Sequence, residues 1–171
     1  MTSPAPDLRD LLKPGETLPP AQAMIDKALE ILAHSQTGHQ LVEFADMEKI
    51  DIRIIATPKP TTYLPESRAA CIGFNKSDPV SPSRFVLMLA GILREAQQEI
   101  SGVSHPDLDE PEEKHIEIGL AKQEDKVWHL CSVAFELSDQ PKFTEYNFLD
   151  ELGKMGHHES IELFRKQERS G

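Results

Sequence analysis

The side chains best suited to metal or acid–base chemistry are seven histidines and 29 acidic residues, and none of them follows a standard catalytic spacing. No two histidines have the HExxH spacing, which places two imidazoles on one helical face beside a glutamate that activates zinc-bound water. The chain also has no glycine-rich phosphate loop and no GxSxG elbow. The sequence therefore predicts neither an ordinary metallohydrolase, nor a nucleotide-dependent enzyme, nor an α/β-hydrolase.

One carboxylate, Glu95, falls on the apolar side of a predicted helix, between Ile92 and Glu99. Because burial of an unpaired charge is unfavourable, this side chain must be reached by a cation such as Arg84 or Arg94, or lie partly in solvent. Its position allows two interpretations. It is either a metal ligand or a helix-edge carboxylate that is partly solvated.

A second carboxylate, Glu124, falls near the edge of the apolar face of a later predicted helix. At about 100° per residue it lies about 40° from Leu120 and about 20° from Cys131, whereas Asp125 points away from that face. Without an imidazole, two glutamates would form an oxygen site suited to a hard cation rather than to catalytic zinc. Glu95 and Glu124 are thus the two candidate metal ligands.

The first half of the chain must supply a helix and a small sheet to position these side chains. A helical period runs over 20–48, with Gly38 as the point where a single helix bends or breaks. Alternating isoleucines over 50–55 and an apolar run over 69–74 predict two strands. A proline-containing surface loop over 57–67 is expected to join them.

The second half of the chain predicts two long helices, over 83–100 and over 112–138, followed by shorter helical segments over 143–152 and at the C-terminus. The expected fold class is α+β, with long helices packed on a small β-sheet and C-terminal helical additions. The apolar face of the second long helix is predicted to consist of Ile116, Leu120, Val127, Cys131 and Ala134.

This order of elements is that of a zincin-like fold, in which one helix would carry HExxH and a second long helix would supply the third ligand. The stretch LAGILREAQQ over 89–98 resembles the active helix, approximately LAHELRHAxQ, of a bacterial family of uncharacterised proteins predicted to be metallopeptidases. The segments LVEFADMEKIDIRI, AACIGFNK and KQEDKVWHLCSVAFEL resemble neighbouring parts of the same family. The resemblance covers about residues 25 to 138 and implies a zincin-like fold.

The resemblance also implies that the metal site of this family has been lost. Matched position by position, the first metal-binding histidine falls on Gly91, the catalytic glutamate on Ile92, and the second metal-binding histidine on Glu95. Glycine offers no ligand and isoleucine cannot accept a proton, so we expect no catalytic residue and no metal or other cofactor. The implied function is that of a pseudoenzyme with a binding, regulatory or structural role. The family's acidic triplet falls on Gln123, Glu124 and Asp125.

Two other functions fit the same residues. One is a metal-dependent peptidase or hydrolase with a non-standard site of Glu95, Glu124 and a histidine from elsewhere in the chain. Zinc is expected only under this alternative. The other sets the resemblance aside and treats the chain as a helical protein-interaction module, which docks through its C-terminal helix and its proline-rich N-terminal arm.

Composition restricts the partners of the chain and its location. With 18 basic and 29 acidic residues the net charge is −11, which would repel a nucleic acid backbone. The N-terminus lacks the apolar core of a signal peptide, and no segment reaches the 18 or more apolar residues that span a bilayer. We therefore expect a cytoplasmic protein that binds neither nucleic acid nor a membrane, and whose partner is an unknown protein or peptide.

Length and cysteine content predict one compact core without disulfides. The 171 residues suffice for one sizeable core. The two cysteines, Cys71 and Cys131, have apolar neighbours and are expected to be small core residues. The predicted organisation is a flexible proline-rich arm over 1–20, a metallopeptidase-related domain over 21–140 and a C-terminal helical extension over 141–171.

Overall fold

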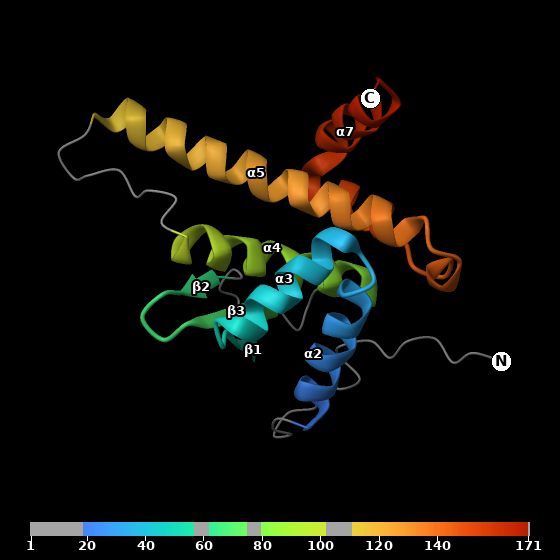
Figure 1. Cartoon of the computed structure of the whole chain (residues 1–171), viewed down its shortest axis with the longest axis horizontal. Coiled ribbons are helices and arrows are strands. Elements are labelled where there is room, and N and C mark those ends of the chain that lie inside the picture. Colours follow the sequence, from blue (N-terminus) through green and yellow to red (C-terminus); the bar gives the residue numbers. More distant parts are fainter. Residues whose placement is uncertain (1–18, 57–61, 75–79, 102–110, 171) are drawn as a thin grey trace.

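The structure is a computed structural model that describes residues 19–56, 62–74, 80–101 and 111–170 (Figure 1). Most of the described chain is helical, and three strands form one mixed sheet, so the α+β class is confirmed. The proline-rich arm predicted over 1–20 lies outside the described residues, except that Pro19 and Pro20 begin the first helix. Within the described ranges, no helix is both long and apolar enough to cross a membrane.

The leading helical segment consists of two helices, α2 (Pro19–Leu32) and α3 (Gln36–Met47). The prediction of one helix interrupted at Gly38 was wrong, because the break lies three residues earlier and Ser35 caps α3 by accepting a hydrogen bond from the Gly38 N–H. Gly38 has a different role. A Cβ there would overlap the Leu32 carbonyl oxygen, so glycine allows α3 to begin close against the end of α2.

The sheet contains β1 (Asp51–Ala56), β2 (Thr62–Leu64) and β3 (Ala69–Phe74) in the order β1-β3-β2. Strand β3 pairs with β1 in parallel and with β2 in antiparallel orientation. The two predicted strands are confirmed, but β2 was missed because it falls in the segment predicted to be a loop. A three-residue strand is too short to show an alternating pattern, so only its pairing with β3 identifies it.

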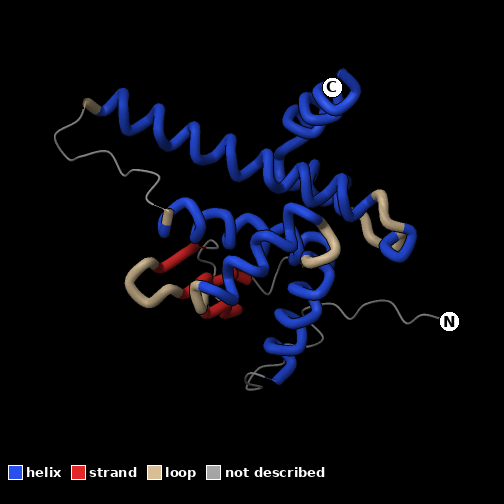
Figure 2. Tube along the Cα trace, viewed as in Figure 1, coloured by secondary structure: helices blue, strands red, loops and turns tan. Residues whose placement is uncertain are grey.

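Helix α4 (Pro82–Ile100) lies between the sheet and α5 (Glu112–Ser138), and both helices have the predicted extents to within a residue. Ser81 accepts a hydrogen bond from the Arg84 N–H and Pro82 occupies the first turn, as expected for a helix start. Figure 2 shows the strands grouped on one side of α4 and α5 on the other. Helix α4 is therefore the central element of the core.

The N-terminal part of α5 extends past the rest of the molecule (Figure 1). At 1.5 Å per residue its 27 residues span about 40 Å, against about 28 Å for the 19 residues of α4. The predicted apolar face of α5 is consequently buried only from Val127 onward, whereas Ile116 and Leu120 are 57% and 60% exposed. Periodicity identified three of the buried residues, Val127, Cys131 and Ala134, but it could not show where the helix that covers them ends.

The C-terminal segment folds back onto α4 and α5. A 3₁₀ turn η1 (Pro141–Phe143) leads into the short helix α6 (Phe148–Leu152), so the amphipathic helix predicted over 143–152 is only partly formed. Phe148 and Leu152 are fully buried in the main core. The π-helical turn η2 (Gly153–His157) contains Gly156 at φ 98°, where the chain changes direction before α7 (His158–Ser170).

Candidate functional site

Gly91, Ile92 and Glu95, the three α4 positions singled out by the sequence comparison, face α5 or the core. Ile92 is buried and 2% exposed. Gly91 is also buried, and a Cβ built on it would meet the Leu130 and Lys126 side chains at 3.7 and 3.9 Å. The absence of a side chain at Gly91 therefore leaves room between α4 and α5 at this point.

Glu95 points towards α5 and forms an ion pair across the two helices. The Nζ of Lys126 donates a hydrogen bond to Glu95 Oε1 at 2.8 Å. The two side chains are only 36% and 20% exposed, so the pair is half-buried. The cation that reaches Glu95 is thus Lys126, rather than either of the arginines, Arg84 and Arg94, suggested by the sequence.

The acidic residues of α5 lie differently from the prediction. Glu124 is exposed, so the expectation that it falls on a buried face was wrong. Asp125 does not point away from the core: its Oδ2 accepts hydrogen bonds of 2.7 Å from both Arg94 and Gln98 on α4. Asp125 and Lys126 thus both contact α4 through their charged groups. The face of α5 that packs on α4 is therefore rotated relative to the predicted apolar face.

These contacts determine the charge state of Asp125. Burial by itself would raise the pKa of Asp125, but the hydrogen bonds from Arg94 and Gln98, with the charges of Arg94 and His129, lower it below the usual 3.8. The carboxylate is therefore ionised at neutral pH and already uses its oxygens in contacts with α4. Its role is to fix the relative position of the two helices.

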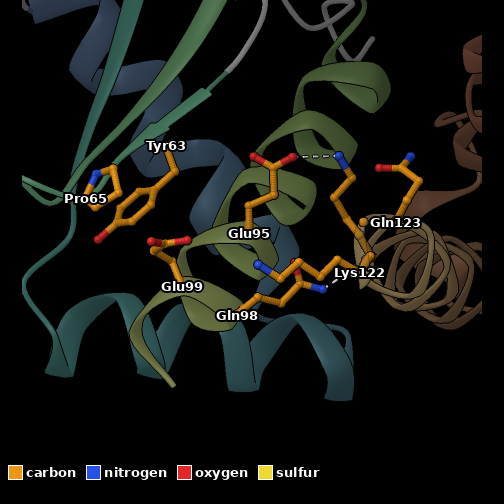
Figure 3. A pocket seen from close by; sticks show the side chains of 9 residues that line it. Tyr63, Pro65, Glu95, Gln98, Glu99, Lys122 and Gln123 are labelled. Carbon is orange, nitrogen blue, oxygen red and sulfur yellow. Dashed lines mark hydrogen bonds and ion pairs between the residues drawn. The ribbon is translucent and has the colours of Figure 1, made fainter. Parts of the chain in front are cut away.

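A cleft lies between β2, α4 and α5, and we name it the Tyr63 cleft. It has a volume of about 240 Å³. Figure 3 shows Tyr63 and Pro65 on one side, Lys122 and Gln123 on the other, and Glu95 and Glu99 between them. The cleft is lined by Tyr63, Pro65, Glu95, Gln98, Glu99, Gly119, Lys122, Gln123 and Lys126.

The hydroxyl of Tyr63 is buried and has no hydrogen-bond partner among the residues that the structure describes. Burial raises the pKa of Tyr63 above 10, and the charges of Glu99 and Glu48 act in the same direction against Arg68. The phenol is therefore neutral at physiological pH and retains an unused donor at the wall of this cleft.

A second, larger cleft of about 420 Å³ adjoins the first on the other side of the Glu95–Lys126 pair, and we name it the Gly91 cleft. It shares Glu95, Gln123 and Lys126 with the Tyr63 cleft. Its walls combine apolar side chains of α4, α5 and η2 with a few polar ones. The lining residues are Arg84, Leu87, Met88, Gly91, Ile92, Glu95, Gln123, Lys126, Leu130, Met155 and His157.

Sequence reasoning missed His157 and Lys126 as members of this site. His157 is more than 60 positions from Glu95 in the chain, and only the reversal at Gly156 brings it to the Gly91 cleft. Burial, followed by the charge of Lys126, lowers the pKa of His157 below 6.5. Its imidazole is therefore neutral at pH 7. The adjacent histidine, His158, instead packs against Gly153.

His129 and the two cysteines do not line either cleft. His129 binds the Asp125 carbonyl oxygen through Nδ1 at 2.9 Å. Cys71 and Cys131 are both buried, as expected, and burial raises the pKa of the Cys131 thiol to about 11. In the described part of the chain, no three histidine, cysteine, aspartate or glutamate side chains lie close enough together to hold a metal ion.

Comparison with known proteins adds no family assignment. The chain has no significant match to a family model, to a curated protein or to a solved structure. The functional argument therefore rests on the two clefts and on the residues that line them.

A carboxylate that does not line either cleft, and that sequence reasoning also missed, connects α5 to α3. Glu136 of α5 accepts hydrogen bonds from Ser35 Oγ at 2.7 Å and from the Thr37 N–H at 2.8 Å. A carboxylate at a helix N-terminus satisfies free N–H groups and interacts favourably with the helix dipole. Glu136 thus anchors α3 to α5, and α3 and α5 both pack on α4.

Proposed function

We propose that this chain is a zincin-like, metallopeptidase-related protein that has lost zinc binding and catalysis and that binds a peptide segment without cutting it. The observation that carries the proposal is the ion pair between Lys126 and Glu95 at 2.8 Å. It lies beside Gly91, at the motif positions where the family would hold a cation. Here a lysine of the chain itself supplies the positive charge.

The chemistry of the replaced positions supports this proposal. An ammonium group can neutralise a carboxylate, but unlike a zinc ion it has no open coordination position at which to activate water. Ile92, at the position of the catalytic glutamate, is buried and has no group that can accept a proton. The site thus retains a cation and a cleft, while it lacks the two components that hydrolysis requires.

The arrangement of elements supports a binding role. Strand β2 is one of the two edge strands of the described sheet, and the Tyr63 cleft separates it from α5. Edge strands offer backbone N–H and C=O groups to an added peptide strand, while the clefts beside them accommodate alternate side chains. The side chains of Lys122 and Gln123 line this cleft and can bind the peptide backbone.

The proposal is tested by purifying the full chain without chelators and measuring bound metals by mass spectrometry, together with cleavage of a mixed peptide library. We expect far less than one equivalent of zinc per chain, intact peptides, and shifts of the NMR signals of Tyr63 and Lys126 when the library is added. About one equivalent of zinc, with peptide cleavage that a chelator abolishes, would contradict the proposal.

One observation favours a metal-dependent hydrolase as the second candidate, because His157 lines the same cleft as Glu95. This alternative requires Lys126 to move away from Glu95. Glu124 cannot serve as its second carboxylate ligand, because Glu124 is exposed and does not line this cleft. It predicts that Glu95→Gln abolishes metal binding, whereas Glu99→Gln, one turn further along α4, does not. Under the leading proposal, neither substitution changes the metal content of the purified protein.

A further inference from the structure

The Gly91 cleft has an apolar wall that is open to a side chain from outside. Its volume of about 420 Å³ lies in the range of small-molecule sites, about 300–1,000 Å³. Met88 and Met155 line it from α4 and η2, and both are only partly buried. Methionine side chains are flexible and polarisable, so they adapt to apolar groups of different shape.

The polar groups of the same cleft are mostly basic, although the chain as a whole has a net charge of −11. Arg84, Lys126 and His157 line the cleft, and among the described residues Glu95 is the single acidic side chain that does so. The positive charge of Arg84 is balanced by Glu151, whose Oε2 lies 2.9 Å from Arg84 Nε. Lys126 and His157 are therefore the groups available to an anionic ligand.

Both of these groups have unused hydrogen-bond donors. The Lys126 ammonium carries three N–H groups, of which one is donated to Glu95. The His157 imidazole forms no hydrogen bond with any residue that the structure describes. A carboxylate that accepts from both would gain two charge-assisted or polar contacts without breaking the Lys126–Glu95 pair.

We propose that the Gly91 cleft binds the C-terminal carboxylate of a peptide that ends in an apolar residue. The carboxylate accepts hydrogen bonds from Lys126 and His157, and the terminal side chain packs against Met88, Leu130 and Met155. This inference rests on the proposed function, since it specifies which part of a peptide the cleft recognises.

The neighbouring cleft favours a peptide over a fatty acid as the source of this carboxylate. The Gly91 and Tyr63 clefts share Glu95, Gln123 and Lys126, so a bound chain can continue from one into the other. The Tyr63 cleft offers polar side chains, as Figure 3 shows for Lys122 and Gln123. These groups can bind backbone amides, whereas a hydrocarbon tail would leave them unpaired and desolvated.

The test measures binding of the full chain to an N-terminally fluorescein-labelled Gly-Ser-Gly-Ser-Leu peptide by fluorescence anisotropy. We expect the free acid to bind at least about tenfold more tightly than the same peptide with a C-terminal amide, since hydrogen bonds to a charged group are the stronger ones. Octanoate is used as an unlabelled competitor. Binding of the free acid should also raise the pKa of His157, which NMR measures directly.

Matched variants separate this site from the rest of the surface. Lys126→Met should weaken binding of the free acid about tenfold, whereas Lys122→Met, one turn away on α5, should leave it within about twofold. Gly91→Leu should fill the cleft and abolish binding, while Gly91→Ala adds only a Cβ at ordinary contact distance and should retain it. Circular dichroism and thermal unfolding verify that each variant is folded.

Equal affinity for the acid and the amide, or an unchanged affinity in both folded Lys126→Met and folded Gly91→Leu, would overturn the inference. Tighter binding of octanoate than of the peptide acid would also overturn it, because the ligand would then be a fatty acid. None of these results depends on zinc content or peptide cleavage. Failure of the inference is therefore distinguishable from failure of the proposed function.

Discussion

The walls of the two clefts that flank the Glu95–Lys126 pair differ in how far their side chains belong to the buried core. Leu87, Ile92 and Leu130 of the Gly91 cleft are at most 2% exposed and belong to the main core. The Tyr63 cleft is lined instead by polar and charged side chains such as Lys122 and Glu99. The comparison indicates that the wall of the Gly91 cleft formed by Leu87, Ile92 and Leu130 is rigid, because close-packed side chains resist rearrangement, whereas the polar wall of the Tyr63 cleft is adaptable.

The largest expected difference in the free energy of unfolding is between truncating a side chain in the wall of the Gly91 cleft and truncating one in the wall of the Tyr63 cleft. Leu130→Ala should lower the free energy of unfolding by about 2–5 kcal/mol, because it removes a buried side chain between α4 and α5. Lys122→Ala should change it by less than about 0.5 kcal/mol, since only the backbone carbonyl of Lys122 bonds to α4. Urea denaturation measures both values. Similar losses would show that both clefts are parts of the core.

The Glu95–Lys126 ion pair, which lines both clefts, should contribute less to the free energy of unfolding than the Leu130 side chain does. Lys126→Met should cost about 1 kcal/mol, because it leaves Glu95 without a partner in a half-buried position. The double variant with Glu95→Gln should recover part of this loss, and a double-mutant cycle measures the coupling between the two side chains. A coupling energy of zero would mean that the pair does not hold the clefts together.

A smaller effect, of opposite sign, is expected in the Tyr63 cleft. Tyr63→Phe should raise the free energy of unfolding by about 0.5–1 kcal/mol, because it removes a buried hydroxyl without a hydrogen-bond partner. Thermal unfolding and urea denaturation are the measurements. A loss of stability would show that the hydroxyl is satisfied by water or by another group. In the wild-type protein, spectrophotometric titration should give a pKa for Tyr63 above 10.

The smallest expected effect is on the pH dependence of stability, and it comes from His157 in the Gly91 cleft. Burial, then the charge of Lys126, lowers the pKa of His157 below 6.5, so the unfolded chain binds a proton more readily than the folded one. This contribution to stability is complete above the unfolded pKa and is lost as the pH falls through the folded pKa. His157→Gln should therefore flatten the decrease in stability on acidification from pH 7.5 to 5. An unchanged slope would place His157 in solvent.

Much of the secondary structure could be predicted because its signals are local. The strand over Ala69–Phe74, the cap at Ser81 and the bounds of α5 all follow from residue types within a few positions. Strand β2 and the break at Ser35 could not be predicted in this way. The first depends on pairing with β3 and the second on packing of α3 against the end of α2.

The features of the candidate site can likewise be separated into those that local sequence predicts and those that depend on tertiary contacts. The sequence by itself determined that Gly91, Ile92 and Glu95 share one helix and that no imidazole stands at these positions, since residue identity and helical spacing are written in the chain. Only the tertiary structure decided that Lys126 reaches Glu95, that Asp125 rather than Glu124 contacts α4, and that His157 lies at the cleft. Contacts between segments that are distant in sequence depend on the rotation and length of packed helices, which periodicity does not specify.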